Sequence, residues 1–334
     1  MKIGVFTDSY RPYTSGVVRS IDTFKDELVN NGHNVYIFSP NYPNCVKEEN
    51  VFRFTSLPAP TKKDFTLAIP LSLSISQTLK KINLDIVHVH SPFLMGHLGR
   101  RVAKKHGLPL IFTFHTLYDQ YAHYMPFLHK TSKEIVKNLG IEFCNTCDLV
   151  ITPTLVIKKH LIRNGVKKPI TNIPTGLAVS EFNNVDRTWL KRKYNLPMDS
   201  IVLLFVGRLG KEKNIDFLIR CFYKSLKHSN NQKLVLVGDG PEKNNLKKII
   251  KNLGISSHVV FTGLLDREEV TKAYVGSDIF VFASVTETQG IVLLEAKAAG
   301  LPAVAISAFG VKEMIEHNGD GYLSSHNEDT FTEY

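Results

Sequence analysis

Residues 281–306 constrain the fold of this chain more than any other stretch, because they read as a strand, a polar loop, a helix and another strand in close succession. The first strand is expected over residues 278–282, and the helix is expected to end at Gly300. Such a unit is typical of an open parallel sheet, which binds ligands in the crevice at the carboxyl ends of its strands. We expect the buried face of the helix to carry Ile291, Leu294 and Ala298.

Two acidic residues of this unit are candidates for a sugar-binding site. Glu287 lies in the loop, and Glu295 lies in the helix that follows. A single Glu in either place is more often a solvated charge. Two carboxylates that open on one crevice are different, because each offers two acceptor oxygens to a pair of neighbouring hydroxyl groups.

The chain is long enough for two such sheets. At 334 residues it exceeds what one hydrophobic core usually holds, so two domains of about 150–180 residues are expected. With 43% hydrophobic and 22% charged residues it has the composition of a soluble globular protein. No apolar run approaches the roughly 20 residues that span a bilayer. The chain runs from Met1 straight into a buried-type strand, so no N-terminal signal is expected.

The net charge of +10 is confined to the first half of the chain. Residues 1–174 contain 22 Lys and Arg against 12 Asp and Glu, whereas the rest contains 19 of each kind. A basic domain beside a neutral one suggests that the basic half meets a polyanion, either nucleic acid or an anionic membrane face. Solubility alone would explain the amount of charge but not its uneven distribution.

Two stretches of the first half have features of a membrane-binding surface. Basic residues recur at helical spacing and would form a positive stripe, to which an anionic bilayer contributes about 1 kcal/mol per cation. The stripe contains no aromatic residues, which argues against nucleic acid. The apolar section 65–75 lies between pairs of lysines, as in an interfacial helix. The alternative for the stripe is a solvated helix face, and the alternative for section 65–75 is a core helix with solvated ends. The stripe consists of Arg100, Arg101, Lys104 and Lys105.

Metal binding is not expected. Cys144 and Cys147 have the spacing of half a zinc site, but no second pair follows, so we favour reduced thiols of the core, which fits a cytoplasmic protein. No Asp-x-Asp pair lies at a crevice loop, so the site is expected to need no metal.

Two residues of the first half are placed to meet a ligand. Gly16 precedes the first helix, where a glycine lets backbone N–H groups approach an anion such as a diphosphate, although close packing is the alternative. His115 follows the expected strand 110–114 at its carboxyl edge, where a structural, hydrogen-bonded histidine is the alternative. The tyrosines that follow could line an acceptor entrance, and they are Tyr118, Tyr121 and Tyr124.

The loop 207–214 of the second half contains Arg208 and Lys213, and its glycines allow it to fold tightly. Two fixed cations above a sheet suit a diphosphate whose negative charge grows as a sugar leaves. Stabilisation of developing charge is usually the largest contribution to catalysis. A mobile basic loop is the alternative.

The two glutamates and their flanking residues, Thr-Glu-Thr-Gln-Gly and Leu-Glu-Ala-Lys-Ala-Ala-Gly-Leu-Pro, resemble the E-x7-E signature of retaining GT-B glycosyltransferases of the GT4 type. The resemblance covers nearly the whole chain in order. It implies an α/β fold of two Rossmann-like domains with doubly wound parallel sheets that face each other across a cleft. The family's linker begins at a Pro-x-Gly like that ending at Gly176. Residues 1–176 would then bind the acceptor and the membrane, and residues 177–334 would bind the nucleotide sugar.

The resemblance also implies roles for individual residues. Glu287 would hold the donor sugar, Glu295 the nucleotide ribose, and His115 would lie near the donor sugar. Arg208 and Lys213 would bind the diphosphate, while main-chain groups of the segment 259–264 would meet the nucleobase. In the loop that follows Ile306, Phe309 replaces the first of two glycines that the family usually has above the donor. The expected donor contacts are Gly16, Arg208, Lys213, Gly263, Leu264, Glu287, Thr288, Gln289, Gly290 and Glu295, and the expected catalytic residues are Glu287, His115, Arg208 and Lys213.

Segments 7–12, 15–20, 114–121 and 286–290 resemble those of bacterial 1,2-diacylglycerol 3-glucosyltransferases. This implies transfer of glucose from UDP-glucose to the free hydroxyl of diacylglycerol, by a peripheral protein on the inner face of the cell membrane. No protein nucleophile would be needed, because the leaving phosphate oxygen can take the acceptor's proton. The alternatives are a soluble acceptor, a phosphatidylinositol mannosyltransferase using GDP-mannose, and a non-catalytic protein that binds nucleotide sugars or anionic lipid. Relatives usually continue with a helix that returns to the first domain, which suggests a short member or a truncated chain.

Overall fold

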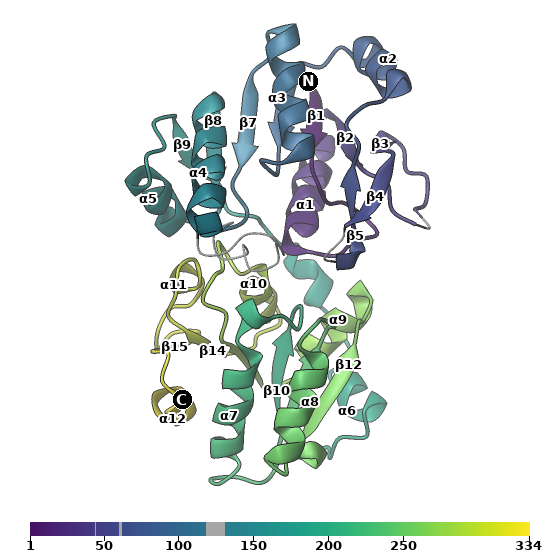
Figure 1. Cartoon of the computed structure of the whole chain (residues 1–334). Helices are drawn as coiled ribbons and strands as arrows, with labels where there is room; N and C mark the ends of the chain where they lie inside the picture. Colours follow the sequence, from purple (N-terminus) through teal and green to yellow (C-terminus); the bar gives the residue numbers. More distant parts are fainter. Residues whose placement is uncertain (44, 60–61, 118–130) are drawn as a thin grey trace. The chain divides into compact units, whose positions relative to one another are not determined.

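The computed structural model describes residues 1–43, 45–59, 62–117 and 131–334. This part of the chain forms two compact units, Met1–Gly176 and Leu177–Tyr334 (Figure 1). The sequence places a domain boundary near the same residue. Each unit has its own sheet and its own core. No helix within the described ranges has the length and apolar character needed to cross a membrane.

The described part of the first unit contains a sheet in which all neighbouring strands are parallel, in the order β3-β2-β1-β6-β7-β8-β9. This is the predicted doubly wound arrangement, and its strand order reverses between β1 and β6. The strands are β1 Lys2–Phe6, β2 Asn34–Pro40, β3 Val51–Phe54, β6 Ile86–Val89, β7 Leu110–Thr113, β8 Leu149–Thr152 and β9 Ile170–Asn172. The helices are α1 Gly16–Asn30, α2 Leu73–Ile82, α3 Leu94–His106, α4 Thr131–Thr146 and α5 Leu155–Arg163.

Short apolar runs become the strands of this sheet because helices cover both faces of a doubly wound parallel sheet. Val18 and Ile21 of α1 belong to the same buried cluster as Val5 of β1 and Ile37 of β2. The helix begins where the Ser15 side chain accepts a hydrogen bond from the backbone N–H of Val18, at 3.3 Å. The loop after β1 is therefore held directly above the carboxyl edge of the sheet.

The apolar section 65–75 is not one helix, and this prediction was wrong. Its first part belongs to β5 Lys62–Ala68, which pairs with β4 Ser56–Ala59 in an antiparallel hairpin. Pro70 follows this strand and disfavours a continuous helix through the section, because proline has no N–H to donate inside a helix. The helix α2 begins only at Leu73, after its capping residue Ser72.

The second unit repeats the arrangement with the parallel order β12-β11-β10-β13-β14-β15, which reverses between β10 and β13. The strands are β10 Ile201–Val206, β11 Gln232–Val237, β12 Val259–Gly263, β13 Ile279–Phe282, β14 Ala303–Ile306 and β15 Gly321–Ser324. The α-helices are α6 Trp189–Lys193, α7 Ile215–Ser225, α8 Lys243–Asn252, α9 Arg267–Val275, α10 Ile291–Ala298, α11 Val311–Met314 and α12 Glu328–Glu333. Single 3₁₀ turns are η2 Val179–Phe182, η3 Lys211–Lys213 and η4 Ser256–His258.

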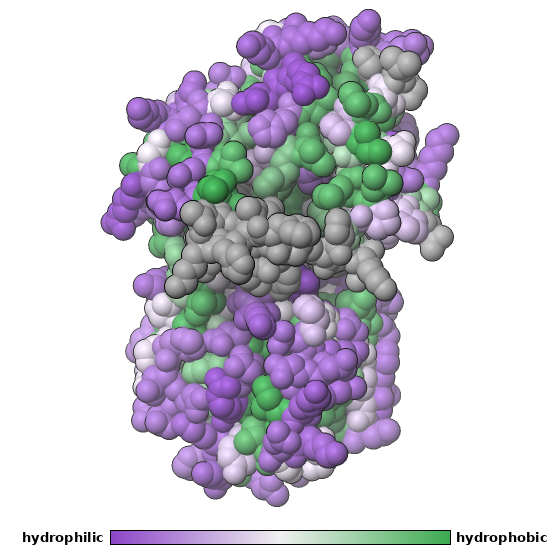
Figure 2. Space-filling view, viewed as in Figure 1, coloured by the Kyte–Doolittle hydropathy of each residue, from purple (hydrophilic) through white to green (hydrophobic). Residues whose placement is uncertain are grey.

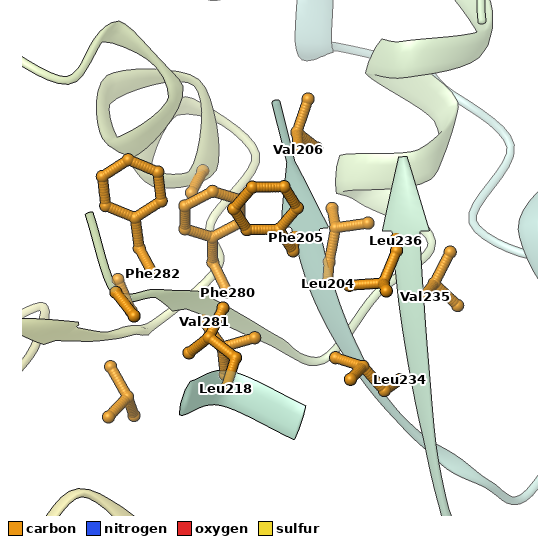
Figure 3. Close-up of a cluster of buried hydrophobic side chains, with 14 of the residues drawn as sticks. Leu204, Phe205, Val206, Leu218, Leu234, Val235, Leu236, Phe280, Val281 and Phe282 are labelled. Carbon is orange, nitrogen blue, oxygen red and sulfur yellow. The ribbon is translucent and has the colours of Figure 1, made fainter. Parts of the chain in front are cut away.

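The core of the second unit contains aromatic side chains from its two central strands (Figure 3). Phe205 of β10 stacks on Phe282 of β13 with ring centroids 6.2 Å apart, and Phe280 lies 5.9 Å from Phe282. Stacked rings of this kind contribute beyond the area that they bury. The two strands that carry the site loops are thus fixed to each other just below those loops.

The buried face of α10 differs from the prediction. The buried residues are Leu293, Glu295 and Ala296, whereas Ile291, Leu294 and Ala298 are only half-buried. The first turns of this helix are apolar on every side, so periodicity alone does not select a face. As a result, Glu295 points into the protein rather than to solvent.

Candidate active site

The site of the second unit lies where its strand order reverses. The loop after β10 and the loop after β13 leave neighbouring strands at the same sheet edge, which is where open parallel sheets bind ligands. The buried Ser284 hydroxyl links the two loops by donating to the Glu212 carbonyl oxygen, at 3.2 Å. Both loops therefore form one rigid rim above the sheet.

Lys213 and Glu287 meet across this rim. The Lys213 Nζ lies 2.5 Å from Oε1 of Glu287, and the side chains are 17% and 15% exposed. Burial raises the pKa of the Glu287 carboxyl, but the charge of Lys213 and hydrogen bonds from Lys213 and Ser284 outweigh burial, so the pKa lies below its usual value. The pair is therefore ionised at neutral pH and remains partly open to a ligand. These two predicted site residues are brought together.

Arg208 occupies the same loop but has a different carboxylate neighbour. Its Nη1 is 3.9 Å from Oε1 of the buried Glu212. A Cβ on Gly210 would lie 2.4 Å from Oε2 of Glu212, so a larger residue would displace that carboxylate. The glycine thus lets the loop fold over the Glu212 carboxylate, and that carboxylate orients Arg208 on the rim.

The other rim loop is packed tightly against the chain after β14. Gly310 donates its N–H to the carbonyl of Glu287, at 3.0 Å, and a Cβ on Gly310 would lie 2.2 Å from the Thr288 carbonyl oxygen. Thr288 and Gln289 are buried, and Gly290 has the left-handed φ of 85°. Glycine is favoured there because other residues rarely adopt that conformation.

Phe309 takes a left-handed conformation with φ of 37°. The family resemblance places a glycine at this position, and the backbone keeps the conformation that glycine would favour. Phe309 is therefore held with local backbone strain.

Glu295 does not join Lys213, Glu287 or Arg208 in the contacts of the described residues. Its Oε1 accepts from Nη1 of Arg267 at 2.5 Å, and its Oε2 accepts from the Tyr274 hydroxyl at 3.0 Å. Sequence reasoning missed both partners. The sequence has no signal for them, because both partners lie on α9 and reach Glu295 on α10 only through the packing of these two helices.

The expected nucleobase segment ends at the edge strand β12. The Gly263 carbonyl accepts from the Gly238 N–H at 2.9 Å, and Gly263 has a φ of 74°. The Leu264 side chain that follows is 79% exposed. The main chain therefore turns at the end of β12, as it would need to do for backbone groups to contact a nucleobase.

The first unit places Asp8 and Ser91 at its own point of strand reversal. The Ser91 hydroxyl donates to Oδ2 of Asp8, and Oδ1 accepts from the backbone N–H of Met95 at 3.0 Å. Burial raises the pKa of Asp8 despite these hydrogen bonds. The carboxyl joins the loop after β1 to the start of α3. Gly16 is the exposed first residue of α1.

His115 belongs to a group of three histidines that sequence reasoning only partly identified. The ring of His90 contacts those of His88 and His115, with centroids 4.1 and 5.1 Å away. Nδ1 of His90 lies 2.8 Å from Nε2 of His115, and Nε2 of His88 lies 2.7 Å from Oγ1 of Thr113. His88 lies on β6 and His90 directly follows the strand, so their spacing of two residues places both on one face, which was the available signal.

Burial keeps these histidines neutral. It lowers the pKa of His88 to about 4 and the pKa of His115 to about 3, and the neighbouring His88 also contributes to the lower pKa of His115. The pKa of His90 is lowered well below its usual value by burial and by both neighbouring rings. The predicted tyrosines Tyr118, Tyr121 and Tyr124 lie outside the described residues.

Cys144 and Cys147 are free, buried thiols. Burial and the neighbouring Cys147 raise the pKa of Cys144, and burial raises that of Cys147 to about 12. Within the described ranges, no three His, Cys, Asp or Glu side chains are grouped so as to hold a metal ion.

Comparisons with known proteins identify the family. Residues 14–181 match the family described as Glycosyltransferase Family 4, and residues 186–333 match Glycosyl transferases group 1. The chain is 33% identical to an alpha-monoglucosyldiacylglycerol synthase of Acholeplasma laidlawii, over 98% of this chain and 86% of that protein. The chain belongs to glycosyltransferase family 4. A synthase of the same name from Streptococcus pneumoniae is 35% identical to this family 4 chain, over 91% of it and 71% of that protein.

Solved structures of other proteins share the fold. Anabaena HepE in complex with UDP and glucose superposes with a TM-score of 0.77 at 19% identity, over 100% of this chain and 88% of that one. A sucrose-phosphate synthase from Thermosynechococcus elongatus has a TM-score of 0.80 at 18% identity, over 99% and 88%. The predicted family, the GT-B class of fold and the prediction of a hexosyltransferase are confirmed.

Proposed function

We propose that this protein transfers glucose from UDP-glucose to the free hydroxyl of 1,2-diacylglycerol, with retention of configuration, at the inner face of the cell membrane. The observation that carries the proposal is the likeness to two alpha-monoglucosyldiacylglycerol synthases at 33% and 35% identity over almost the whole chain. The ionised pair of Lys213 and Glu287 at the sheet edge supports a sugar donor there.

The donor would be held by charges that already lie on the rim. Arg208 and Lys213 would bind the diphosphate, and Glu287 would accept hydrogen bonds from the sugar hydroxyls. Glu287 can bind the sugar without losing its ion pair, because one carboxylate oxygen can stay on Lys213 while the other accepts from a sugar hydroxyl. Glu295 would accept the ribose hydroxyls, and main-chain groups near Gly263 and Leu264 would meet the base.

The reaction proposed here exchanges one carbon–oxygen bond for another and transfers one proton. The bond between the anomeric carbon and the phosphate oxygen breaks, and the diacylglycerol oxygen bonds to that carbon on the same face. The acceptor's proton passes to the leaving phosphate oxygen. Arg208 and Lys213 would stabilise the charge that develops on the diphosphate, which is the role that preorganised cations fill best. His115, neutral through burial, would donate or accept a hydrogen bond near the sugar without adding charge.

Surface features of the first unit support a lipid acceptor. Arg101, Lys104 and Lys105 of α3 are exposed. In the hairpin β4–β5, Leu57 and Leu67 pair across the strands and are 60% and 39% exposed. Figure 2 shows apolar side chains among hydrophilic ones on the face of the first unit that it presents. Exposed cations and exposed apolar side chains are both features of a surface that binds anionic lipid.

The test is product analysis after incubation with diacylglycerol vesicles and a panel of UDP- and GDP-sugars. We expect a glycolipid from UDP-glucose only. A second candidate is transfer from GDP-mannose, because a GDP-mannose-dependent alpha-mannosyltransferase of Corynebacterium glutamicum is 27% identical over 97% of this chain and 76% of that protein. A mannolipid from GDP-mannose would favour that candidate. No lipid product from any donor would contradict a lipid acceptor.

A further inference from the structure

Glu295 is the buried carboxylate of a polar network in the second unit. Arg267 donates from Nη1 to Glu295, and from Nε and Nη2 to Oε2 of Glu181, at 2.9 and 2.6 Å. Tyr274 donates its hydroxyl to the other oxygen of Glu295. Arg267 and Tyr274 both belong to α9, Glu295 to α10 and Glu181 to η2. The network therefore links three elements, and α9 supplies both donors to the Glu295 carboxylate.

Because the Glu295 carboxylate is buried, protein groups rather than water set its direction. The Glu295 side chain is 7% exposed, and Tyr274 is fully buried. Burial and the charge of Glu295 raise the pKa of Tyr274 well above its usual value, so its hydroxyl remains a donor. A buried carboxylate without such donors would be costly to ionise.

The geometry leaves acceptor capacity for a ligand. Each carboxylate oxygen has two lone pairs, and each oxygen of Glu295 accepts one hydrogen bond within the network. One acceptor site thus remains on each oxygen. Two neighbouring hydroxyl groups, such as those of a ribose, match that pattern.

We propose that Arg267 and Tyr274 are positioning residues that hold Glu295 in the orientation in which its two oxygens receive the two ribose hydroxyls of the nucleotide donor. The inference rests on the proposed function through the ribose role of Glu295. It adds two residues to the donor site that neither contact the reacting atoms nor belong to the E-x7-E signature.

The planar shape of the Arg267 guanidinium suits it to hold Glu295 in one orientation. Its planar fork contacts two carboxylates at once, with one edge on Glu181 and one nitrogen on Glu295. A lysine offers a single charged nitrogen on a flexible stem and does not reproduce this arrangement. The Phe182 ring, 5.8 Å from the guanidinium carbon, supports the same side chain by a cation–π contact.

The experiment compares binding of UDP with binding of 2′-deoxy-UDP by isothermal titration calorimetry of the full chain. The variants are Arg267→Met and Tyr274→Phe. Matched controls are Arg220→Met, whose guanidinium also bridges two carboxylates, those of Asp216 and Glu328, and Tyr223→Phe on the same helix. Tyr274→Phe removes one oxygen only, so it decides the question even if Arg267→Met does not fold.

We expect the wild type and both controls to bind UDP about tenfold more tightly than its deoxy analogue, since hydrogen bonds to a charged acceptor are strong. In Arg267→Met and Tyr274→Phe the ratio should fall to about threefold or less, through weaker binding of UDP and not of the analogue. An unchanged ratio in both variants would overturn the positioning role. A wild type that binds both nucleotides equally, or neither, would instead overturn the proposed ribose contact itself.

Discussion

Lys213→Met tests the ionised pair at the rim of the second unit. Methionine keeps an unbranched side chain of similar length but removes the charge, so Glu287 loses the partner that lies 2.5 Å away. Breaking a buried ion pair costs about 3–5 kcal/mol. Because both side chains retain some exposure, 17% and 15%, we expect the lower end, about 3 kcal/mol of unfolding free energy at pH 7. Transfer should fall about 100- to 1000-fold, as when one preorganised donor is removed.

The pH dependence of this loss identifies its cause. In the wild type the pKa of Glu287 is lowered, because Lys213 and Ser284 outweigh burial. That stabilisation is present above the unfolded pKa, about 4.3, and is lost as the pH falls through the folded value. In Lys213→Met, Glu287 loses the positive charge and the hydrogen bond that oppose the effect of burial. The pKa of its carboxyl should therefore be higher than in the wild type. The stability deficit of the variant should therefore be largest near pH 7 and shrink towards pH 4.

The assay measures urea unfolding at pH 7, 5 and 4, together with transfer to diacylglycerol vesicles at pH 7. Lys211→Met is the matched control, because Lys211 belongs to the same turn, η3, and is exposed. It should keep wild-type stability. Transfer by Lys213→Met within threefold of the wild type would refute the reasoning, as would a deficit that does not change with pH.

Two further predictions concern the first unit. Replacing Arg101, Lys104 and Lys105 by Gln should weaken binding to anionic vesicles by about 1 kcal/mol per charge, whereas replacing the exposed Lys247, Lys248 and Lys251 of α8 should not. Flotation at two salt concentrations measures this, and equal binding by both variants would contradict it. The wild type should also lose stability as the pH falls from about 6.5 towards 4, by up to about 1.4 kcal/mol per pH unit for each neutral buried histidine, because the unfolded chain binds more protons there. His88→Asn should flatten this slope in urea unfolding, and an unchanged slope would be the contrary result.

The alternation of strands and helices could be predicted because parallel sheets need continuous apolar strands separated by helices. The strand over residues 201–206 was predicted with the bounds that the structure has. The hairpin β4–β5 could not be separated from the helix after it, since residues 65–75 are apolar without a clear period. What separates them is Pro70 together with the pairing of Leu67 with Leu57.

Loop residues of the candidate site could be identified from their position after strands β10 and β13. The contact of Lys213 with Glu287 follows, because those strands are neighbours in a doubly wound order. The partners of Glu295 could not be predicted, because Arg267 and Tyr274 reach it only through the packing of α9 against α10. In the same way, the contact of His90 with His115 depends on the register of β6 against β7. Secondary structure places such residues on elements, whereas their partners are set by tertiary packing.

The configuration of the lipid product tests the central claim most directly. Wild-type protein would be incubated with UDP-glucose and diacylglycerol vesicles, and the purified glycolipid examined by proton NMR at the anomeric position. We predict one glucose attached through an α linkage to the free hydroxyl of diacylglycerol. A β-linked product, or glucose released only into water, would contradict the account.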